Sequence, residues 1–204
     1  MLMFPRKDLV VLAMPKCGTT ALEAKLGKRA PVAFRGGGVK HVSMSQFERH
    51  LAPLLAESGR ERSSYEVVSL FREPMSWVES WWRYRSREKL TSGPRQANFT
   101  GHLSFENFVE THLEGVAPGV VDGGSQSDFV AGLDGEVGVD RLFRYERFDD
   151  FVAYLEERLS RRLELEQVNV SPDHPEEPTL STATRARLEE HLRRDYEIYG
   201  SIPG

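Results

Sequence analysis

The sequence predicts an α/β fold with three layers, in which a central parallel sheet is flanked by helices. Three segments favour this fold, because each has a short apolar run, then a turn, then an apolar pattern of helical period; they begin at Asp8, Tyr65 and Val139. Strands that alternate with helices pair in parallel, since each helix returns the chain to the edge where the strand began. The 204 residues suffice for a sizeable core, and we expect a single domain over residues 1–204.

The composition is that of a globular protein, with 39% hydrophobic and 28% charged residues. A net charge of -4 argues against a general nucleic-acid binder, which needs a broadly basic face. Cys17 is the single cysteine, so neither an intramolecular disulfide nor a cysteine-based zinc site is expected, and a reducing, cytoplasmic location fits best. We expect no signal peptide and no membrane span, because no apolar run approaches the roughly 20 residues that cross a bilayer.

The first unit contains a buried strand over Asp8 to Met14 and a helix that Gly18 or Thr19 caps and Gly27 ends. A short second strand is predicted over Pro31 to Phe34, followed by a glycine-rich loop. Another helix is expected to begin near Ser45, with apolar residues on its inner face: Phe47, Leu51, Leu54 and Leu55.

The second unit contains a strand over Tyr65 to Phe71 and a helix with Pro74 in its first turn. This helix carries an aromatic stripe, which favours core packing over ligand stacking: Trp77, Trp81 and Tyr84. Residues 87–102 turn polar and predict a surface loop, long enough to act as a lid or an acceptor-binding loop.

Ser104 is expected to cap a short helix through His112, whereas the run from Gln126 to Val130 is too short to assign. The third unit contains a strand over Val139 to Tyr145 and a helix opened by Asp149. Residues 165–180 predict a surface linker. After it, Ser181 caps a last helix with three residues on its apolar side: Leu188, Leu192 and Tyr196.

The stretch from Pro15 to Thr20, between the first strand and its helix, predicts an anion site. Backbone N–H groups at a helix N-terminus attract anions, and Lys16 adds a positive charge. The stretch departs from the Walker A pattern G-x-x-x-x-G-K-[ST], because Lys16 precedes Gly18 and no glycine opens the loop. A P-loop nucleotide kinase or hydrolase is therefore an alternative with weaker support, and a non-catalytic nucleotide-binding module is another.

The same stretch resembles the 5′-phosphosulfate loop of the sulfotransferase family, P-K-[ST/C/G]-G-[ST]-[ST/R]-x-L, which here runs from Pro15 to Leu22. A second signature of that family is an Arg at a strand end, then a Pro, and a Ser eight residues after the Arg; Arg72, Pro74 and Ser80 match it. Weaker similarities cover much of the remaining chain: Gln126 to Phe129, Arg144 to Glu146, Asn169 to Ser171, and Asp195 to Glu197 with Tyr199.

The resemblance implies the P-loop-NTPase-like sulfotransferase fold and transfer of a sulfuryl group from 3′-phosphoadenosine 5′-phosphosulfate (PAPS) to a hydroxyl or amine. The acceptor would be a small molecule or a glycan, and the in-line transfer would use no metal. The 5′-phosphate would be cradled by backbone N–H groups and hydroxyls of the loop: Cys17, Gly18, Thr19 and Thr20. Lys16 would neutralise charge on the leaving phosphate, and Arg72 with Ser80 would bind the 3′-phosphate.

A base must remove the acceptor proton, and His41 is our choice because imidazole titrates near neutral pH and His41 lies in the segment where the family places its base. Lys40 would contact the sulfuryl oxygens. His102 and Glu106 are weaker alternatives for the base.

Two features have more than one interpretation. Cys17, beside Lys16 at a helix N-terminus, is either a reactive thiolate or a small residue that the family tolerates there. The cations Arg83, Arg85, Arg87 and Lys89 either steer an anionic acceptor or form a solvated polar face. The sequence also departs from the family, because Asn169 to Pro175 offers His174 where many members supply a Lys or Arg to the 3′-phosphate. The sequence identifies neither the acceptor nor the oligomeric state.

Overall fold

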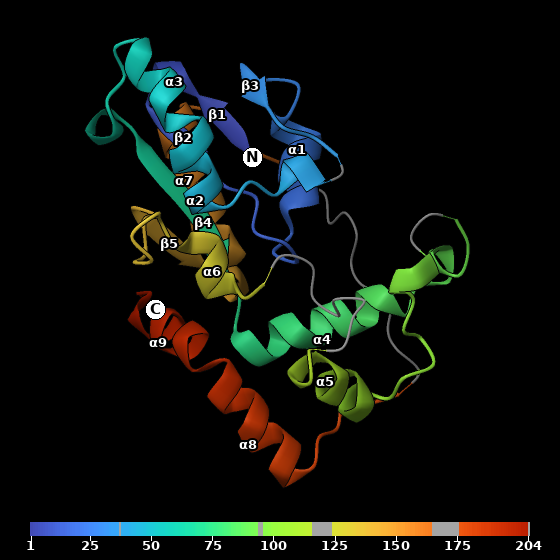
Figure 1. The fold of residues 1–204 in the computed structure, drawn as a ribbon. Coiled ribbons are helices and arrows are strands. Elements are labelled where there is room, and N and C mark those ends of the chain that lie inside the picture. Colours follow the sequence, from blue (N-terminus) through green and yellow to red (C-terminus); the bar gives the residue numbers. More distant parts are fainter. Residues whose placement is uncertain (37, 94–95, 116–123, 165–175, 204) are drawn as a thin grey trace.

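A mixed, open sheet of five strands forms the centre of the computed structural model, which describes residues 1–36, 38–93, 96–115, 124–164 and 176–203 (Figure 1). The order across the sheet is β3-β1-β2-β4-β5. The strands are β1 (Leu2–Phe4), β2 (Leu9–Val11), β3 (Val32–Ala33), β4 (Glu66–Phe71) and β5 (Arg141–Arg144). β2, β4 and β5 are parallel, whereas β1 is antiparallel to both of its neighbours.

The parallel sheet predicted from the sequence is therefore correct for β2, β4 and β5 and wrong for the N-terminal edge. There, β1 pairs with β2 through a hairpin, with Met3 opposite Val10. A 3-10 turn over Pro5–Lys7 and a left-handed Asp8 (φ 47°) make the reversal. β1 is buried on both faces because it is wholly apolar, but three apolar residues are too few to predict a strand by periodicity.

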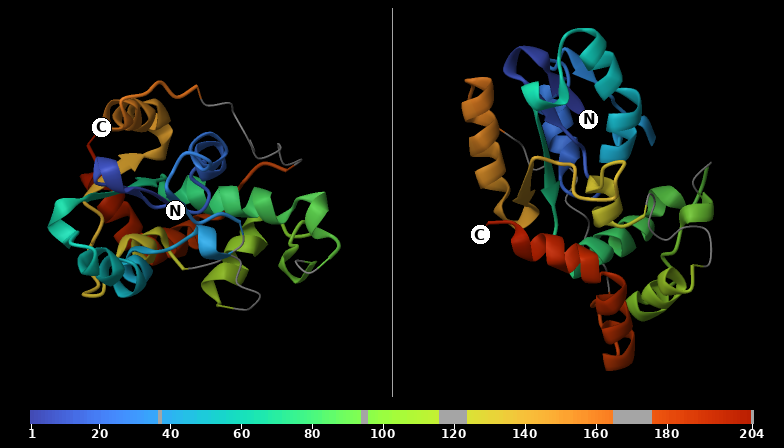
Figure 2. Two further views of the ribbon diagram at one scale, coloured as in Figure 1. Left: turned by 90° about the horizontal axis from the view of Figure 1, so that it is seen from above. Right: turned by 60° about the vertical axis from the view of Figure 1, so that its left-hand side comes forward.

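Helices flank the sheet on both faces, α7 on one and α2 with α3 on the other (Figure 2). Four further helices, α4, α5, α8 and α9, gather beyond the carboxyl ends of the parallel strands (Figures 1 and 2). The helices are α1 (Thr19–Leu26), α2 (Met44–His50), α3 (Ala52–Glu57), α4 (Pro74–Arg85), α5 (Phe105–Leu113), α6 (Gln126–Val130), α7 (Phe148–Leu159), α8 (Thr182–His191) and α9 (Arg193–Ser201). Among the described residues, none of the helices has the length and apolar character to traverse a bilayer.

Two helices predicted as continuous are interrupted. The helix expected from Ser45 divides at Leu51, because Pro53 has no N–H group and opens α3 instead of extending α2. Leu54, expected on the inner face, is 63% exposed. The last helix divides at Leu192, which is buried, and the bend directs α9 toward α6.

The aromatic stripe of α4 packs in the core, as predicted. Trp77 and Trp81 are buried and meet edge to face, with centroids 6.1 Å apart, and Trp81 meets Tyr84 in the same way at 5.8 Å. Tyr84 is half-buried. The stripe therefore ends in a ring that remains partly accessible.

The two predicted surface segments are described in part. The loop over 87–102 contains two 3-10 turns, Glu88–Leu90 and Gln96–Asn98, and residues 94–95 lie outside the described ranges. Most of the predicted linker, including the segment from Asn169 to Pro175, also lies outside them.

Candidate functional site

The predicted anion loop lies at the carboxyl end of β2, where ligands bind in open α/β sheets. Three side chains from separate parts of the chain hold its backbone carbonyls. His41 contacts the Ala13 carbonyl through Nδ1 at 2.6 Å, Trp77 Nε1 donates to the Pro15 carbonyl at 3.0 Å, and Arg72 Nη1 donates to the Lys16 carbonyl at 3.1 Å. The loop is thus fixed before any ligand arrives.

The backbone of the loop has the alternation that turns successive N–H groups toward one point. Lys16 and Gly18 adopt left-handed conformations, with φ of 64° and 66°, and Cys17 between them has a negative φ. A Cβ on Gly18 would lie 3.3 Å from the rings of Tyr145 and Phe148, so glycine suits this position in space as well as in conformation. No side chain caps α1, and of the N–H groups in its first turn, that of Ala21 donates to the Gly18 carbonyl at 3.1 Å.

Arg72 is held at the end of β4 by a buried amide. Gln126, on α6, accepts a hydrogen bond from the Arg72 N–H and donates one to the Arg72 carbonyl, both at 2.9 Å. Asp195 on α9 accepts from the N–H groups of Gln126 and Ser127 and thereby anchors the start of α6. Burial raises the pKa of this carboxyl group. The segment from Gln126 to Val130, which sequence analysis left unassigned, therefore positions Arg72, a predicted ligand-binding residue.

The guanidinium group of Arg72 is placed by a ring and a hydroxyl. It lies 4.6 Å from the centroid of Tyr145, and its Nε donates to Ser76 Oγ at 3.0 Å. Ser80, predicted to share this task, lies one helical turn further along α4 and is 4% exposed. The hydroxyl that bonds to Arg72 in the structure is that of Ser76, which sequence analysis missed, because Arg72 precedes α4 and helical spacing does not relate the two residues.

Lys16 extends over the aromatic end of α4. Its Nζ lies 4.2 Å from the centroid of Tyr84 and 5.7 Å from that of Trp81. Burial, followed by the positive charges of Arg87 and Arg72, lowers the pKa of Lys16 to about 7. A bound anion would favour the charged form of this amine.

His41 has the arrangement of an oriented base. Since a carbonyl can only accept, the contact to Ala13 requires a proton on Nδ1 and leaves Nε2 as the acceptor. Burial lowers the pKa of His41, so the ring is neutral at pH 7. The alternatives are engaged elsewhere: Glu106 accepts hydrogen bonds from Ser181 and Thr184 on the α8 side, and His102 packs on Phe99 with centroids 6.2 Å apart.

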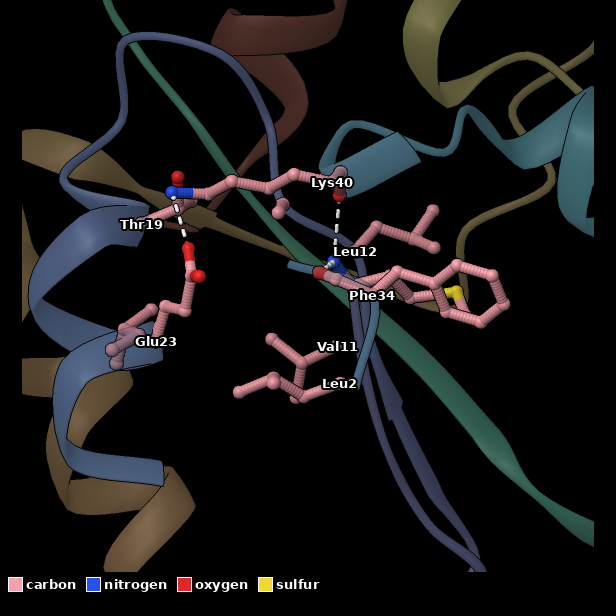
Figure 3. A pocket seen from close by; sticks show the side chains of 10 residues that line it. Leu2, Val11, Leu12, Thr19, Glu23, Phe34 and Lys40 are labelled. Carbon is pink, nitrogen blue, oxygen red and sulfur yellow. Dashed lines mark hydrogen bonds and ion pairs between the residues drawn. The ribbon is translucent and has the colours of Figure 1, made fainter. Parts of the chain in front are cut away.

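Lys40 reaches the first turn of α1 but has a counter-charge. Its Nζ lies 2.8 Å from the Glu23 carboxylate and donates to Thr20 Oγ1 at 3.2 Å. Figure 3 shows this ion pair at a hollow of about 270 Å³, including the part open to solvent, which Thr19 also lines. Neither Lys16 nor Arg72 lines this hollow. The Glu23 carboxylate would therefore compete with the sulfuryl oxygens for the predicted contact with Lys40.

Cys17 is fully buried, and burial raises the pKa of its thiol well above the ordinary value. Its Sγ lies 3.9 Å from Gln126 Oε1. The interpretation as a reactive thiolate is therefore disfavoured, and Cys17 acts as a small buried residue beneath the loop.

Comparison with protein-family models, characterised proteins and solved structures found no match to this chain. The function must therefore be argued from the loop and its surroundings.

Proposed function

We propose that this chain is a PAPS-dependent sulfotransferase. The observation that carries the proposal is the meeting of two cations from neighbouring strand ends, Lys16 and Arg72, at a loop whose backbone suits an anion. Among the described residues, no carboxylate forms an ion pair with either cation. A donor with two separate phosphate groups would neutralise both.

The order of residues in the loop supports this donor over ATP or GTP. In the Walker A pattern the lysine follows the last glycine of the loop, whereas Lys16 precedes Gly18 and its side chain extends over Tyr84. In the proposed complex, the N–H groups from Cys17 to Thr20 bind the 5′-phosphate, and Arg72 with Ser76 binds the 3′-phosphate.

The transfer step needs a base, a leaving group and a charge-stabilising cation. His41 Nε2 removes the proton of the acceptor hydroxyl, and the hydroxyl oxygen forms a bond to sulfur as the bond from sulfur to the 5′-phosphate oxygen breaks. The electron pair of the broken bond stays on that oxygen, where Lys16 stabilises the charge, and adenosine 3′,5′-bisphosphate leaves. The contact from Nδ1 to Ala13 would hold the ring so that Nε2 accepts from the acceptor hydroxyl while its oxygen lies in line with the leaving group.

Calorimetric titration with adenosine 3′,5′-bisphosphate tests the proposal. We expect binding in the micromolar range, and no binding at about 1 mM would refute it. The Arg72→Ala variant should lose about tenfold or more in affinity for the bisphosphate and little for adenosine 5′-phosphate, which lacks the second phosphate. Equal losses for the two nucleotides would show that Arg72 does not bind the 3′-phosphate.

The His41→Ala variant separates catalysis from binding. It should bind the bisphosphate nearly as wild type does, and its rate of transferring the labelled sulfuryl group from PAPS should be lower by about 100-fold or more. Binding of PAPS with no transfer by the wild-type chain to any acceptor would favour the non-catalytic nucleotide-binding module.

A further inference from the structure

The half-buried ring of Tyr84 is surrounded by cations. Lys16 Nζ lies 4.2 Å from its centroid, Arg87 Cζ 5.1 Å and Lys89 Nζ 5.9 Å. We call these four residues the Tyr84 cluster. Within the described ranges, no ion pair joins any of the three cations to a carboxylate, including Glu88, which stands between two of them in the sequence.

Buried hydrogen-bond donors beside the cluster have no acceptor. The indole N–H of Trp81, a side chain that is 5% exposed and contacts both Tyr84 and Lys16, is unpaired in the described part of the chain. The Nε of Arg87 is buried and unpaired as well. An unmet buried donor costs about 1–3 kcal/mol, so a site with two of them is suited to a ligand that accepts.

The attraction of one ring does not account for three cations. A cation–π contact contributes about 0.5–1 kcal/mol at an exposed site, and neighbouring like charges oppose one another by a similar amount. That opposition is visible in Lys16, whose pKa Arg87 and Lys89 both help to lower. A bound anion would relieve it.

The other cations of the segment are engaged differently. Arg83 forms an ion pair with Glu79 at 3.5 Å, and Arg85 is 1% exposed and lies over Trp81, with its Cζ 5.5 Å from the ring centroid. The four-cation series therefore divides into an engaged pair and the two members of the Tyr84 cluster. Lys16 and Arg87 are half-buried and Lys89 is exposed, so the cluster can be reached from solvent.

We infer that the Tyr84 cluster binds a negatively charged group of the acceptor, a carboxylate or a sulfate ester, next to the hydroxyl that receives the sulfuryl group. The inference rests on the proposed function, because it takes Lys16 as the point of transfer. Arg87 and Lys89 hold the negative group, Trp81 donates to it, and the hydroxyl on the same molecule faces His41.

Three probes with the same ring hydroxyls test the inference: methyl β-glucoside, its uronate and its 6-sulfate. Each is titrated into the wild-type chain saturated with adenosine 3′,5′-bisphosphate. We expect the uronate or the sulfate to bind at least about tenfold more tightly than the neutral glucoside, and the better of the two identifies the charged group. Equal binding of all three, or no binding of either anion at about 10 mM, would overturn the inference.

The double variant Arg87→Gln, Lys89→Gln should remove the preference for the anion and change affinity for the bisphosphate by less than about twofold. Arg83→Gln is the matched control, since it removes the same type of charge from an engaged cation on α4. An equal loss in the control would show a net-charge effect, and a parallel loss of bisphosphate affinity in the double variant would assign the cluster to the donor; either result overturns the inference.

Failure of the proposed function is distinguishable from failure of this inference. If the wild-type chain binds no bisphosphate, the proposed donor is wrong, and the three probes are titrated into the free protein. Preference for the anions there, lost in the double variant, would keep the Tyr84 cluster as an anion site without a transfer role.

Discussion

Replacing Gln126 with Met tests whether a buried amide positions Arg72. Methionine has a similar length and no strong hydrogen-bonding group, so Gln126→Met removes two bonds of 2.9 Å to the Arg72 backbone without leaving a cavity. At about 1 kcal/mol for each bond, the loss of unfolding free energy should be about 2 kcal/mol. With a slope of about 2 kcal/mol per molar urea, the midpoint of denaturation should fall by about 1 M. Affinity for adenosine 3′,5′-bisphosphate should fall about tenfold, because the backbone that positions the Arg72 guanidinium group is no longer held by hydrogen bonds.

Thr184→Val is the matched control, since it removes two hydrogen bonds of a buried side chain far from Arg72: Thr184 Oγ1 donates to Glu106 and accepts from Ser181 Oγ. This control should lose a similar amount of stability and keep its nucleotide affinity. The titrations are made well below the unfolding transition of both variants. Unchanged affinity in Gln126→Met would refute the positioning role, and a stability loss below about 0.5 kcal/mol would refute the energetic argument.

Three further predictions concern the loop and the helical layer. Gly18→Ala should destabilise the chain by about 1–2 kcal/mol in urea denaturation, because an alanine at φ 66° is strained and would press on Tyr145 and Phe148; wild-type stability would contradict this. Bisphosphate binding at about pH 8 should be accompanied by the uptake of about 0.9 proton, because Lys16, with a pKa of about 7, is mostly neutral in the free protein and becomes charged beside a phosphate. Calorimetry in buffers of different ionisation enthalpy measures this proton uptake. Equal uptake by the Lys16→Met variant would show that another group binds the proton. Burial, and then His191, lower the pKa of His112 to about 4, whereas an unfolded histidine binds a proton near pH 6.5. Stability should therefore decline as pH falls from about 6.5 to 4, and His112→Gln should flatten that decline in midpoints measured at pH 7 and 5; an unchanged slope would show that His112 is not responsible.

Local sequence determined the units from which the site is built. Apolar runs and turn residues placed β2, β4 and β5 to within a few residues, and Ser43, Ser104 and Ser181 cap their helices through short-range hydrogen bonds. The anion loop was also local: Gly18, in the left-handed conformation, directly precedes α1. Such features are readable because the interacting groups lie within a few positions of one another in the chain.

Tertiary structure decided which of these units meet. His41 reaches Ala13 across 28 positions, Arg72 reaches Lys16 across 56, and Gln126 supports Arg72 across 54. No periodicity reports such pairs, because they arise from how the helices and strands pack. The hydrogen bond from Arg72 Nε to Ser76 Oγ has the same origin, since it depends on the direction of the Arg72 side chain; the role predicted for Ser80 stays a prediction.

The electrostatic character of the site was likewise beyond the sequence alone. The sequence gives no reason to separate the four basic residues from position 83 to position 89. In the structure, only Arg87 and Lys89 among them join Lys16 at Tyr84, while Arg83 pairs with Glu79. Whether a charge attracts a ligand depends on burial and on the nearest counter-charge, and both are set by residues distant in sequence. The sequence by itself specified a loop for an anion, and the tertiary structure decided which cations remain available to hold one.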